Sequence, residues 1–566
     1  MPLDPKTMRT AEGRAEVAAI AELGGGNAWR IAARTSEVPD LPAVLTDRPM
    51  VNADGTPQSE FSLRELDELA QAWSCWYSDQ GVRPRDRVAV YLTDGFEDQL
   101  HLTALAQLGA IPVLLNGKLP PDVAAVLIER ADPVGIFSDP EHLAALGDRV
   151  LDRLGWQATQ QSVGAVGRRQ LPEAARYRHH ADDPVLLCHS SGTTGMPKLV
   201  IWSHEQSVAG ARFRLNTHPE PADSILLSAV PQSHSAAIAF TFYALLAGVP
   251  LLVVSEQSGP GVAASVARHR PTTVLAFNHT LAALALMDLD PADFSSVADW
   301  MNVGDSAHDA HIRPLMRLGN HRAEDGSRVP GSIFGDGLGS SELGWAALRR
   351  VIEPGGEVRP RCLGKVVPIA EVAVLRPDGS LAGEREVGLL GVRSASVARG
   401  YWNDHDTAVR SWLNGYWLSG DLVFREGEDF FHVDRAVDRI PTRPVEGYSL
   451  YMEELLLLQL PEVADCAVVS GRFGDQTVPV ALVRLKAQHA DADPAELIER
   501  ANDGLARRDQ PRLAVLEVDQ ADGAIPVGAT GKILKPRLRE KYADLASYLA
   551  AGSPGRLATA LPRNGS

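Results

Sequence analysis

The stretch His189-Ser-Ser-Gly-Thr-Thr-Gly-Met-Pro-Lys198 directly follows the apolar run 184–188, which is typical of a buried strand. Two glycines and four hydroxyl side chains lie within six residues of this stretch, and a lysine ends it. Such a loop can turn backbone N–H groups and hydroxyls towards phosphate oxygens, while the lysine adds a positive charge. The spacing of Gly192 and Lys198 does not fit the Walker A pattern. On this stretch alone, a flexible surface turn is the other interpretation.

Strand-like and helix-like runs alternate on both sides of this loop. The strand-like runs are 87–92, 111–115, 134–137, 224–230, 249–254 and 273–277, and helix-like runs include 96–108 and 121–130. This alternation predicts βαβ units, and therefore parallel strands with helices on both faces of the sheet. Beyond residue 440 the pattern changes to β-rich stretches, one helix and a further strand, as in a small α+β domain.

We therefore predict an α/β fold with a large N-terminal domain and a small one at the C-terminal end. The large domain, residues 1–435, has parallel-rich sheets flanked by helices and a β-barrel-like portion. The small α+β domain, residues 436–545, is expected to be mobile. Residues 546–566 are punctuated by Gly, Pro and Ser without periodicity, which predicts a disordered tail.

Composition excludes several classes of function. The 566 residues carry 55 Lys and Arg against 72 Asp and Glu, a formal charge of −17, which argues against nucleic acid or an anionic membrane as a partner held by bulk charge. The four cysteines lie far apart with no C-x-x-C pair, so neither a disulfide framework nor a cysteine zinc site is expected. No apolar run reaches the ~18–20 residues that cross a bilayer. We expect a cytoplasmic protein.

Further motifs follow the Ser/Gly/Thr loop in a particular order. They are Ala229-Val-Pro-Gln-Ser-His234, Asn302-Val-Gly-Asp-Ser306, Asp336-Gly-Leu-Gly-Ser-Ser-Glu342, Gly388-Leu-Leu-Gly-Val-Arg393 with Gly400-Tyr-Trp-Asn403, Tyr416-Trp-Leu-Ser-Gly-Asp421, and Pro526-Val-Gly-Ala-Thr-Gly-Lys532. With the loop, this order resembles the adenylate-forming superfamily of acyl-CoA synthetases, stand-alone adenylation domains and luciferases. The resemblance covers about residues 40–545 and is strongest to an acyl-CoA ligase.

The resemblance implies a reaction in two steps. A carboxylate attacks the α-phosphate of ATP to give acyl-AMP and pyrophosphate, and a thiol then takes the acyl group. Because the first step joins two anions, its catalysis consists mainly of charge neutralisation and alignment. The implied cofactors are ATP or a supplied acyl-AMP, CoA and Mg²⁺, and the implied partners are a small-molecule carboxylic acid and CoA or a carrier protein. The protein would be a monomer or a homodimer.

Residue roles carry over from the matching motif positions. Ser190, Ser191, Gly192, Thr193, Thr194, Gly195 and Lys198 would hold the β- and γ-phosphates. Ser341 would bond the α-phosphate, Glu342 would bind Mg²⁺, and Lys532 would bridge the acid and the α-phosphate. Asp421 would accept the ribose hydroxyls, Arg435 would bind ribose or phosphate, Val437 matches the hinge, and Gly447 would lie beside the CoA arm. Gly304, Asp305, Ser306, Asp336, Gly337 and Leu338 would surround the nucleotide, and His234, Ala237, Phe277, Asn278, Gly304 and Gly339 would line the acid pocket, with His234 at its entrance.

Each role has an ordinary structural alternative. Glu342 could be a helix-start glutamate, which the helix dipole favours. Asp421 could cap a tight turn, and Lys532 could be a solvated lysine of a basic segment. His234 could equally be a satisfied core histidine. The small apolar residues of 235–247 either leave room for a bulky hydrophobic acid or belong to a buried helix packed with alanine.

Three positions depart from the family pattern, because Leu338 stands where a tyrosine usually stacks on adenine, Leu199 replaces a glycine, and Val437 replaces a polar hinge residue. We therefore hypothesise that adenylation is weak and that thioester formation from a supplied acyl-AMP dominates. Two rival hypotheses are an adenylation enzyme that loads a separate carrier protein, and a catalytically degenerate nucleotide- or acyl-binding protein.

Overall fold

The computed structural model describes residues 5–190, 196–305, 307, 309–323, 325–357, 359–519, 525–526, 533–552 and 555–561. The chain divides into two compact units, each discontinuous in sequence. The first unit comprises Met1–Ser190, Pro197–Val372 and Val392–Ser419, and the second comprises Ser191–Met196, Ala373–Gly391 and Gly420–Ser566. The domain boundary predicted at residue 435 stays a prediction. The last change from one unit to the other falls between Ser419 and Gly420.

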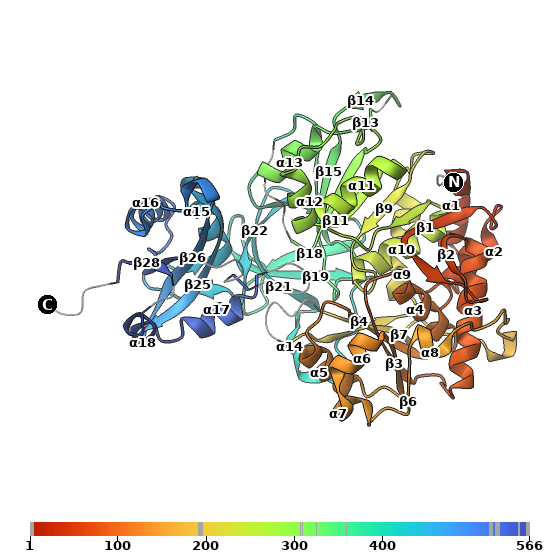
Figure 1. The fold of residues 1–566 in the computed structure, drawn as a ribbon. Coiled ribbons are helices and arrows are strands. Elements are labelled where there is room, and N and C mark those ends of the chain that lie inside the picture. The colour runs from red at the N-terminus through yellow and green to blue at the C-terminus, as the bar shows by residue number, and fades with distance from the viewer. Residues whose placement is uncertain are drawn as a thin grey trace. The chain divides into compact units, whose positions relative to one another are not determined.

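A six-stranded sheet in the first unit carries the Ser/Gly/Thr loop. Its order is β6-β5-β3-β4-β7-β8, all parallel except β8, and the loop joins β7 to β8. The strands are β3 (Arg87–Leu92), β4 (Ile111–Asn116), β5 (Gly135–Ser138), β6 (Trp156–Ala158), β7 (Pro184–His189) and β8 (Leu199–Ser203). Its helices are α3 (Leu63–Asp79), α4 (Glu97–Gln107), α5 (Pro121–Ala131), α6 (Pro140–Leu146), α7 (Asp148–Leu151) and α8 (Gln160–Val163). The predicted βαβ alternation is thus confirmed here (Figure 1).

A second sheet of the first unit presents the other candidate residues at its strand ends. Its order runs β17-β16-β15-β12-β11-β9-β10-β1-β2, with a parallel centre from β15 to β1. The strands are β1 (Pro42–Val51), β2 (Pro57–Ser62), β9 (Leu226–Ala229), β10 (Leu251–Val253), β11 (Thr273–Phe277), β12 (Asp299–Val303), β15 (Ile333–Leu338), β16 (Leu348–Ile352) and β17 (Cys362–Val366). Because parallel strands end at one edge, Phe277, Val303 and Leu338 finish at the same side of this sheet.

Helices pack around this second sheet, and α9 packs on α10. They are α1 (Ala11–Ala18), α2 (Ala28–Thr35), α9 (Gln206–Thr217), α10 (Ser235–Ala247), α11 (Gly259–His269), α12 (Asn278–Ala285) and α13 (Asp309–Met316), with α14 (His405–Arg410) near the end of the unit and a short hairpin of β13 (Asn320–Arg322) and β14 (Arg328–Pro330). The largest core cluster contains residues of both sheets and nearly all of α10, which explains why that helix is apolar all round.

The second unit contains an antiparallel β region and the small α+β part expected from the sequence. The strands of the β region are β18 (Ala370–Leu375), β19 (Gly388–Ser394), β21 (Tyr416–Glu426) and β22 (Asp429–Arg435), and the chain crosses between units within β18, β19 and β21. The short strand β20 (Trp412–Leu413), which pairs with β21, belongs to the first unit. The small part has β23 (Arg439–Ile440), β24 (Gly447–Tyr448), β25 (Val463–Phe473), β26 (Gln476–Leu485), β27 (Val515–Val518), β28 (Arg556–Thr559), α15 (Ser449–Gln459), α16 (Pro494–Ala506), α17 (Lys535–Lys541) and α18 (Leu545–Ala550). The α/β class with a separate α+β part is therefore confirmed.

The segment predicted to be a tail differs from that expectation. Residues Leu545–Ala550 form α18, and β28 pairs antiparallel with β27, so that Val515 opposes Thr559. Strand β28 has only four residues, too few for an alternating pattern to appear in the sequence. The four cysteines, Cys75, Cys188, Cys362 and Cys466, are all buried. Within the described ranges, none of the helices combines the length and apolar character that crossing a membrane requires.

Candidate active site

Strands β7 and β8 hold the two ends of the Ser/Gly/Thr loop together. The Ser190 backbone N–H donates to the Lys198 carbonyl at 2.9 Å, and the Lys198 N–H donates to Ser190 Oγ at 3.1 Å. Residues 191–195, which include five of the predicted phosphate ligands, lie outside the described residues, as do Ser306 and Lys532. The sheet therefore holds the two ends of the loop next to each other.

The segment Gly400-Tyr401-Trp402 joins this loop to Glu342. Its backbone pairs with β8, where Ile201 N–H donates to Gly400 O at 3.0 Å and Trp402 N–H donates to Leu199 O at 2.8 Å. The Lys198 ammonium lies 5.5 Å from the Tyr401 ring centre, and the Tyr401 hydroxyl donates to Glu342 Oε1 at 3.0 Å. Burial and the adjacent carboxylate raise the pKa of Tyr401, so its hydroxyl keeps its proton and donates it.

Ser341 is fixed next to the start of the same loop. The Trp202 indole N–H donates to Ser341 O at 2.8 Å, and Ser341 Oγ lies 3.2 Å from Ser235 Oγ at the start of α10. Ser341 Oγ also donates to His189 O at 3.4 Å. The structure thus brings together Ser190, Lys198, Ser341 and Glu342, which are up to 152 positions apart in sequence.

These residues fit a magnesium–nucleotide complex by the chemistry of their donors. Mg²⁺ is usually bound by one or two carboxylates together with substrate phosphates. In the described part of the chain no group of three His, Cys, Asp or Glu side chains converges on a common point, so an all-protein cage is absent there. Glu342 would therefore share the ion with phosphate oxygens, and the ion would neutralise charge on those oxygens.

The predicted adenine-side residues come from the neighbouring ends of β12 and β15. Asn302 opposes Asp336, and Asn302 Nδ2 donates both to Asp336 Oδ1 at 2.9 Å and to the Asp305 carbonyl at 2.6 Å. Arg350 pairs with Asp336 Oδ2 at 2.8 Å. Burial raises the pKa of Asp336, although Arg350 opposes this effect. Asp336 on β15 therefore connects β12 to β16 through Asn302 and Arg350. The sequence motifs did not indicate a supporting role for either of these two residues.

Gly304, Phe277 and His234 meet at the expected entrance of the acid pocket. Gly304 has φ +94°, and an added Cβ there would lie 2.8 Å from Phe277 Cδ1, so the position requires glycine. The rings of Phe277 and His234 pack edge to face at 5.0 Å, and His234 Nδ1 accepts the Ala236 N–H at 3.2 Å as the N-cap of α10. Ala237 is fully buried within α10.

Two polar side chains belong to the segments next to these residues. Asp94 Oδ1 accepts the Gln232 N–H at 2.6 Å, next to His234, and burial raises the pKa of Asp94 to about 6. Asn278 Oδ1 is buried and has no hydrogen-bond partner among the described residues. A buried acceptor without a partner costs free energy unless a ligand or water satisfies it.

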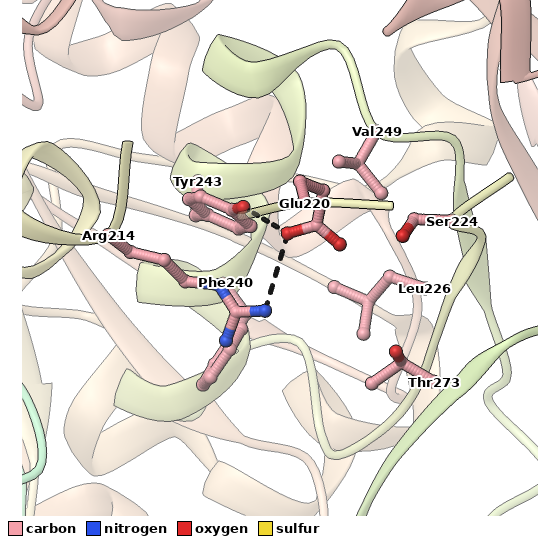
Figure 2. A pocket seen from close by; sticks show the side chains of 8 residues that line it. All are labelled: Arg214, Glu220, Ser224, Leu226, Phe240, Tyr243, Val249 and Thr273. Atoms are coloured by element: carbon pink, nitrogen blue, oxygen red, sulfur yellow. Dashed lines mark hydrogen bonds and ion pairs between the residues drawn. The ribbon is translucent and has the colours of Figure 1, made fainter. Parts of the chain in front are cut away.

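The far side of α10 is closed. Phe240 stacks on Trp345 at 5.0 Å, and behind it lies a cavity of about 10 Å³, room for one water molecule. Arg214 donates to Glu220 at 3.4 Å across this cavity, and Tyr243 donates to the same carboxylate (Figure 2). The lining is Arg214, Glu220, Ser224, Leu226, Phe240, Tyr243, Val249 and Thr273. Because the arginine is already paired and the space is small, this cavity is not an acid pocket.

The second unit holds the predicted ribose group. Asp421 on β21 opposes Arg435 on β22, and Arg435 Nη1 donates to Asp421 Oδ1 at 3.0 Å. His432 Nε2 lies 3.2 Å from the same oxygen. Asp421 is 6% exposed, and both neighbours contact its carboxylate. His432 stands three positions before Arg435 and belongs to no motif that the sequence suggested.

Two further predicted residues of the second unit have different surroundings. Val437 at the expected hinge is 51% exposed. Gly447 begins β24 in a hairpin with β23, and an added Cβ would lie 2.8 Å from Pro511 Cγ and 3.3 Å from Ile440 Cβ. Packing inside the unit is therefore sufficient to require glycine at position 447.

Comparison with known proteins defines the family. Residues 32–402 match the AMP-binding enzyme family, so the chain belongs to that family, and this confirms the superfamily predicted from the motifs. The chain is 37% identical to a 3-aminoavenalumate diazotase of Streptomyces sp over 552 residues, covering 94% of this chain and 98% of the relative. It is 28% identical to the 3-amino-2-hydroxy-4-methoxybenzoate diazotase of Streptomyces cremeus over 546 residues, covering 88% and 92%.

The solved structures agree with this fold. One is an anthranilate CoA ligase, AuaEII, in complex with anthranoyl-AMP, with a TM-score of 0.76 and 20% identity over 92% of this chain and 98% of the other. The large sheet-rich unit and the α+β part are therefore those of adenylate-forming enzymes.

Proposed function

We propose that this protein is an adenylate-forming diazotase, which uses ATP and nitrite to convert an aryl amine into a diazonium ion. The observation that carries the proposal is the 37% identity to a diazotase along nearly the full length of both chains. The paired loop ends, Ser341 and Glu342 support the nucleotide half of the reaction, because they suit the adenylation of any small oxyanion.

Nitrite can replace a carboxylate in this chemistry. A nitrite oxygen attacks the α-phosphorus, a new P–O bond forms, the bond to the β-phosphate oxygen breaks, and pyrophosphate leaves. The amine nitrogen of the second substrate then attacks the nitrosyl nitrogen, and AMP leaves with the N–O bond electrons. The attacking amine releases one proton, and the remaining N–H proton of the N-nitroso amine moves to the nitroso oxygen to give the diazohydroxide. The diazohydroxide then takes up a proton and releases water. The sum is amine, nitrite and ATP giving diazonium, water, AMP and pyrophosphate.

The chain's residues divide between these two steps. Lys198 and Ser190 would hold phosphate oxygens, and Ser341 would donate to the α-phosphate as charge develops there. The Asn278 oxygen supports the amine step, because an aryl amine has N–H groups to donate to an unpaired acceptor and a carboxylate has none. His234 and Phe277 would flank the incoming ring. Lys532 would bridge nitrite and the α-phosphate.

An acid–thiol ligase, which makes acyl-AMP and then an acyl-CoA, is the second candidate. The hairpin that carries Gly447 favours it, because this loop resembles the one that lines the CoA arm in acyl-CoA synthetases. Weak adenylation is a variant of this second candidate, whereas an adenylation enzyme that loads a carrier protein and a catalytically degenerate nucleotide- or acyl-binding protein are separate alternatives.

One experiment separates the candidates. The purified full chain is incubated at neutral pH with ATP and Mg²⁺, and AMP and pyrophosphate are measured with nitrite plus a 3-amino-hydroxybenzoate, or with aromatic acids plus CoA. Diazonium is trapped by azo coupling to a naphthylamine dye and measured by absorbance. We expect AMP release to require nitrite and the azo dye to require all three substrates, and Lys532→Ala to reduce both signals to a low but measurable rate. AMP release that needs a carboxylic acid and CoA but not nitrite would establish the ligase instead.

A further inference from the structure

The second unit buries a lysine three positions after Lys532. Lys535, the first residue of α17, is 5% exposed. Its ammonium donates to Ser449 Oγ at 2.7 Å and pairs with Glu453 Oε1 at 2.9 Å. Burial alone would lower the pKa of Lys535, but Glu453, Asp434 and Asp438 together raise it, so the side chain stays charged. A buried charge of this kind must be paired, and both partners lie on α15.

Ser449 and Glu453 are in turn fixed to other segments of the unit. Glu453 Oε1 accepts the Val468 N–H at 2.7 Å, and Ser449 Oγ donates to the Val468 carbonyl. The Ser449 N–H donates to Asp434 Oδ2 at 2.5 Å. Asp434 directly precedes Arg435 on β22, and Ser449 lies two positions after Gly447. Lys535 therefore contacts Ser449, and the hydrogen bond from Ser449 to Asp434 connects β22, which carries Arg435, to the segment that follows Gly447.

A second ion pair connects α17 to the residues that follow β22. Arg539, one turn further along α17, pairs with Asp438 Oδ1 at 2.5 Å, next to the predicted hinge residue Val437. Burial raises the pKa of Asp434 to about 7, the nearby Asp438 and Glu453 add to this, and Lys535 opposes it. The group thus has three acids and two bases packed between β22, α15 and α17.

The loop that carries Lys532 is closed at its base immediately before Lys535. The Leu534 N–H donates to the Pro526 carbonyl at 2.7 Å, and residues 527–532 lie between these two ends, outside the described residues. Because Lys535 follows Leu534 directly, the position of this base depends on where Lys535 is held.

We propose that Lys535 is a positioning residue, which anchors the base of the Lys532 loop to Glu453 and Ser449 and so determines where Lys532 can reach. The alternative is a buried ion pair that serves stability only. The catalytic part of the inference rests on the proposed adenylation step, so its test includes one measurement that does not depend on activity.

That measurement is hydrogen–deuterium exchange of the full chain. Lys535→Met should speed exchange in peptides covering 526–534 at least about tenfold, while peptides from α9 and α10 keep their rates. The matched control is Lys541→Met, which makes the same substitution on the same helix where the lysine pairs with Glu517 at 3.1 Å. Unchanged exchange at 526–534 in a folded Lys535→Met chain overturns the inference, whatever reaction the enzyme performs.

The kinetic measurement uses pyrophosphate exchange with the oxyanion that the unmodified enzyme activates. Displacing Lys532 should lower the maximal rate about 100-fold and leave the KM for ATP within a factor of two, because Asp421 and Arg435 are untouched. In a Lys532→Ala background, Lys535→Met should then have no further effect on the exchange rate, because the side chain that Lys535 positions is absent. An equal further loss in that background would mean a general structural role and would overturn the inference.

Two conservative variants protect the test against simple unfolding. Lys535→Arg keeps the charge and should retain most of the exchange rate, whereas Glu453→Gln keeps the shape but removes the anion and should act like Lys535→Met. An absence of pyrophosphate exchange in the unmodified enzyme with nitrite and with every acid would refute the proposed function alone, and the hydrogen-exchange result would still decide the role of Lys535.

Discussion

The hydroxyl of Tyr401 donates a hydrogen bond to Glu342 Oε1 at 3.0 Å, and the ring of the same tyrosine lies 5.5 Å from the Lys198 ammonium. One side chain therefore connects the end of the phosphate loop with the proposed magnesium ligand. A hydrogen bond to a ligating carboxylate orients it and limits its motion, which raises metal affinity.

Tyr401→Phe should weaken the metal site while leaving the loop in place. We expect the Mg²⁺ concentration for half-maximal pyrophosphate exchange to rise about tenfold, with little change in rate at saturating Mg²⁺. The control is Tyr177→Phe, which removes a comparable bond to Asp183 Oδ2 at 3.2 Å elsewhere in the first unit. An unaltered Mg²⁺ requirement would show that Glu342 needs no support from Tyr401, or that it does not bind the ion.

Asp421→Asn should reduce recognition of the ribose. In the proposed complex the Asp421 carboxylate would accept the ribose hydroxyls, and a hydrogen bond to a charged group of this kind contributes about 1.5–3 kcal/mol, which an amide would largely lose. The KM for ATP should rise about 10- to 100-fold. The unmodified enzyme should also discriminate against 2′-deoxy-ATP and 3′-deoxy-ATP, and the variant should do so much less. Asp475→Asn, in the exposed β25–β26 turn, is the control, and equal discrimination by both variants would remove the ribose role.

Several motif residues lie together in the structure because the motifs stand at strand ends. A parallel sheet brings such ends to one edge, so the neighbourhood of Asn302 and Asp336 could be expected from the order of strands and helices alone. The supporting contacts could not. Tyr401 lies 59 positions from Glu342, and Lys535 lies 86 from Ser449, separations that follow from packing and from no sequence period.

Gly447 illustrates the opposite case, in which a motif residue has a second explanation. The sequence predicts a glycine because a CoA arm would approach its backbone, whereas the structure supplies contacts to Pro511 and Ile440 that exclude a side chain in any event. A short strand such as β28 could not be predicted, because four residues in a Gly/Pro-punctuated stretch carry no usable alternation.

Gly447→Ala distinguishes these explanations. Overpacking against Pro511 Cγ should lower the free energy of unfolding by about 1–3 kcal/mol, measured by urea denaturation of the second unit's transition. Azo-dye formation per folded molecule should be unchanged if the acceptor is an amine. A variant of normal stability that has lost only CoA-dependent turnover would favour the thiol ligase.

Asn278→Leu tests the amine step. Loss of the unpaired acceptor should raise the KM for the aryl amine about five- to tenfold, the value of one ordinary hydrogen bond. Nitrite-dependent pyrophosphate exchange, which precedes the amine, should keep its rate. Asn216→Leu on the exposed side of α9 is the control. If the variant impairs exchange and leaves the amine KM unchanged, Asn278 acts on the nucleotide half instead.

Buried His101 should make the first unit sensitive to acid. Its Nδ1 lies 2.9 Å from the Tyr77 hydroxyl, and complete burial lowers its pKa to about 3. An unfolded histidine takes up a proton below about pH 6.5, whereas the folded one stays neutral until about pH 3, so stability falls as pH decreases between these values. This single group should lower the free energy of unfolding by about 2 kcal/mol between pH 7 and pH 5.

The variant His101→Gln can still accept a hydrogen bond from Tyr77 but cannot titrate. Its free energy of unfolding should start lower at pH 7 and should decrease by about 2 kcal/mol less than that of the unmodified protein between pH 7 and pH 5. His405→Gln, at an exposed position, should follow the unmodified protein. Parallel pH curves for all three proteins would mean that His101 is protonated in the folded state.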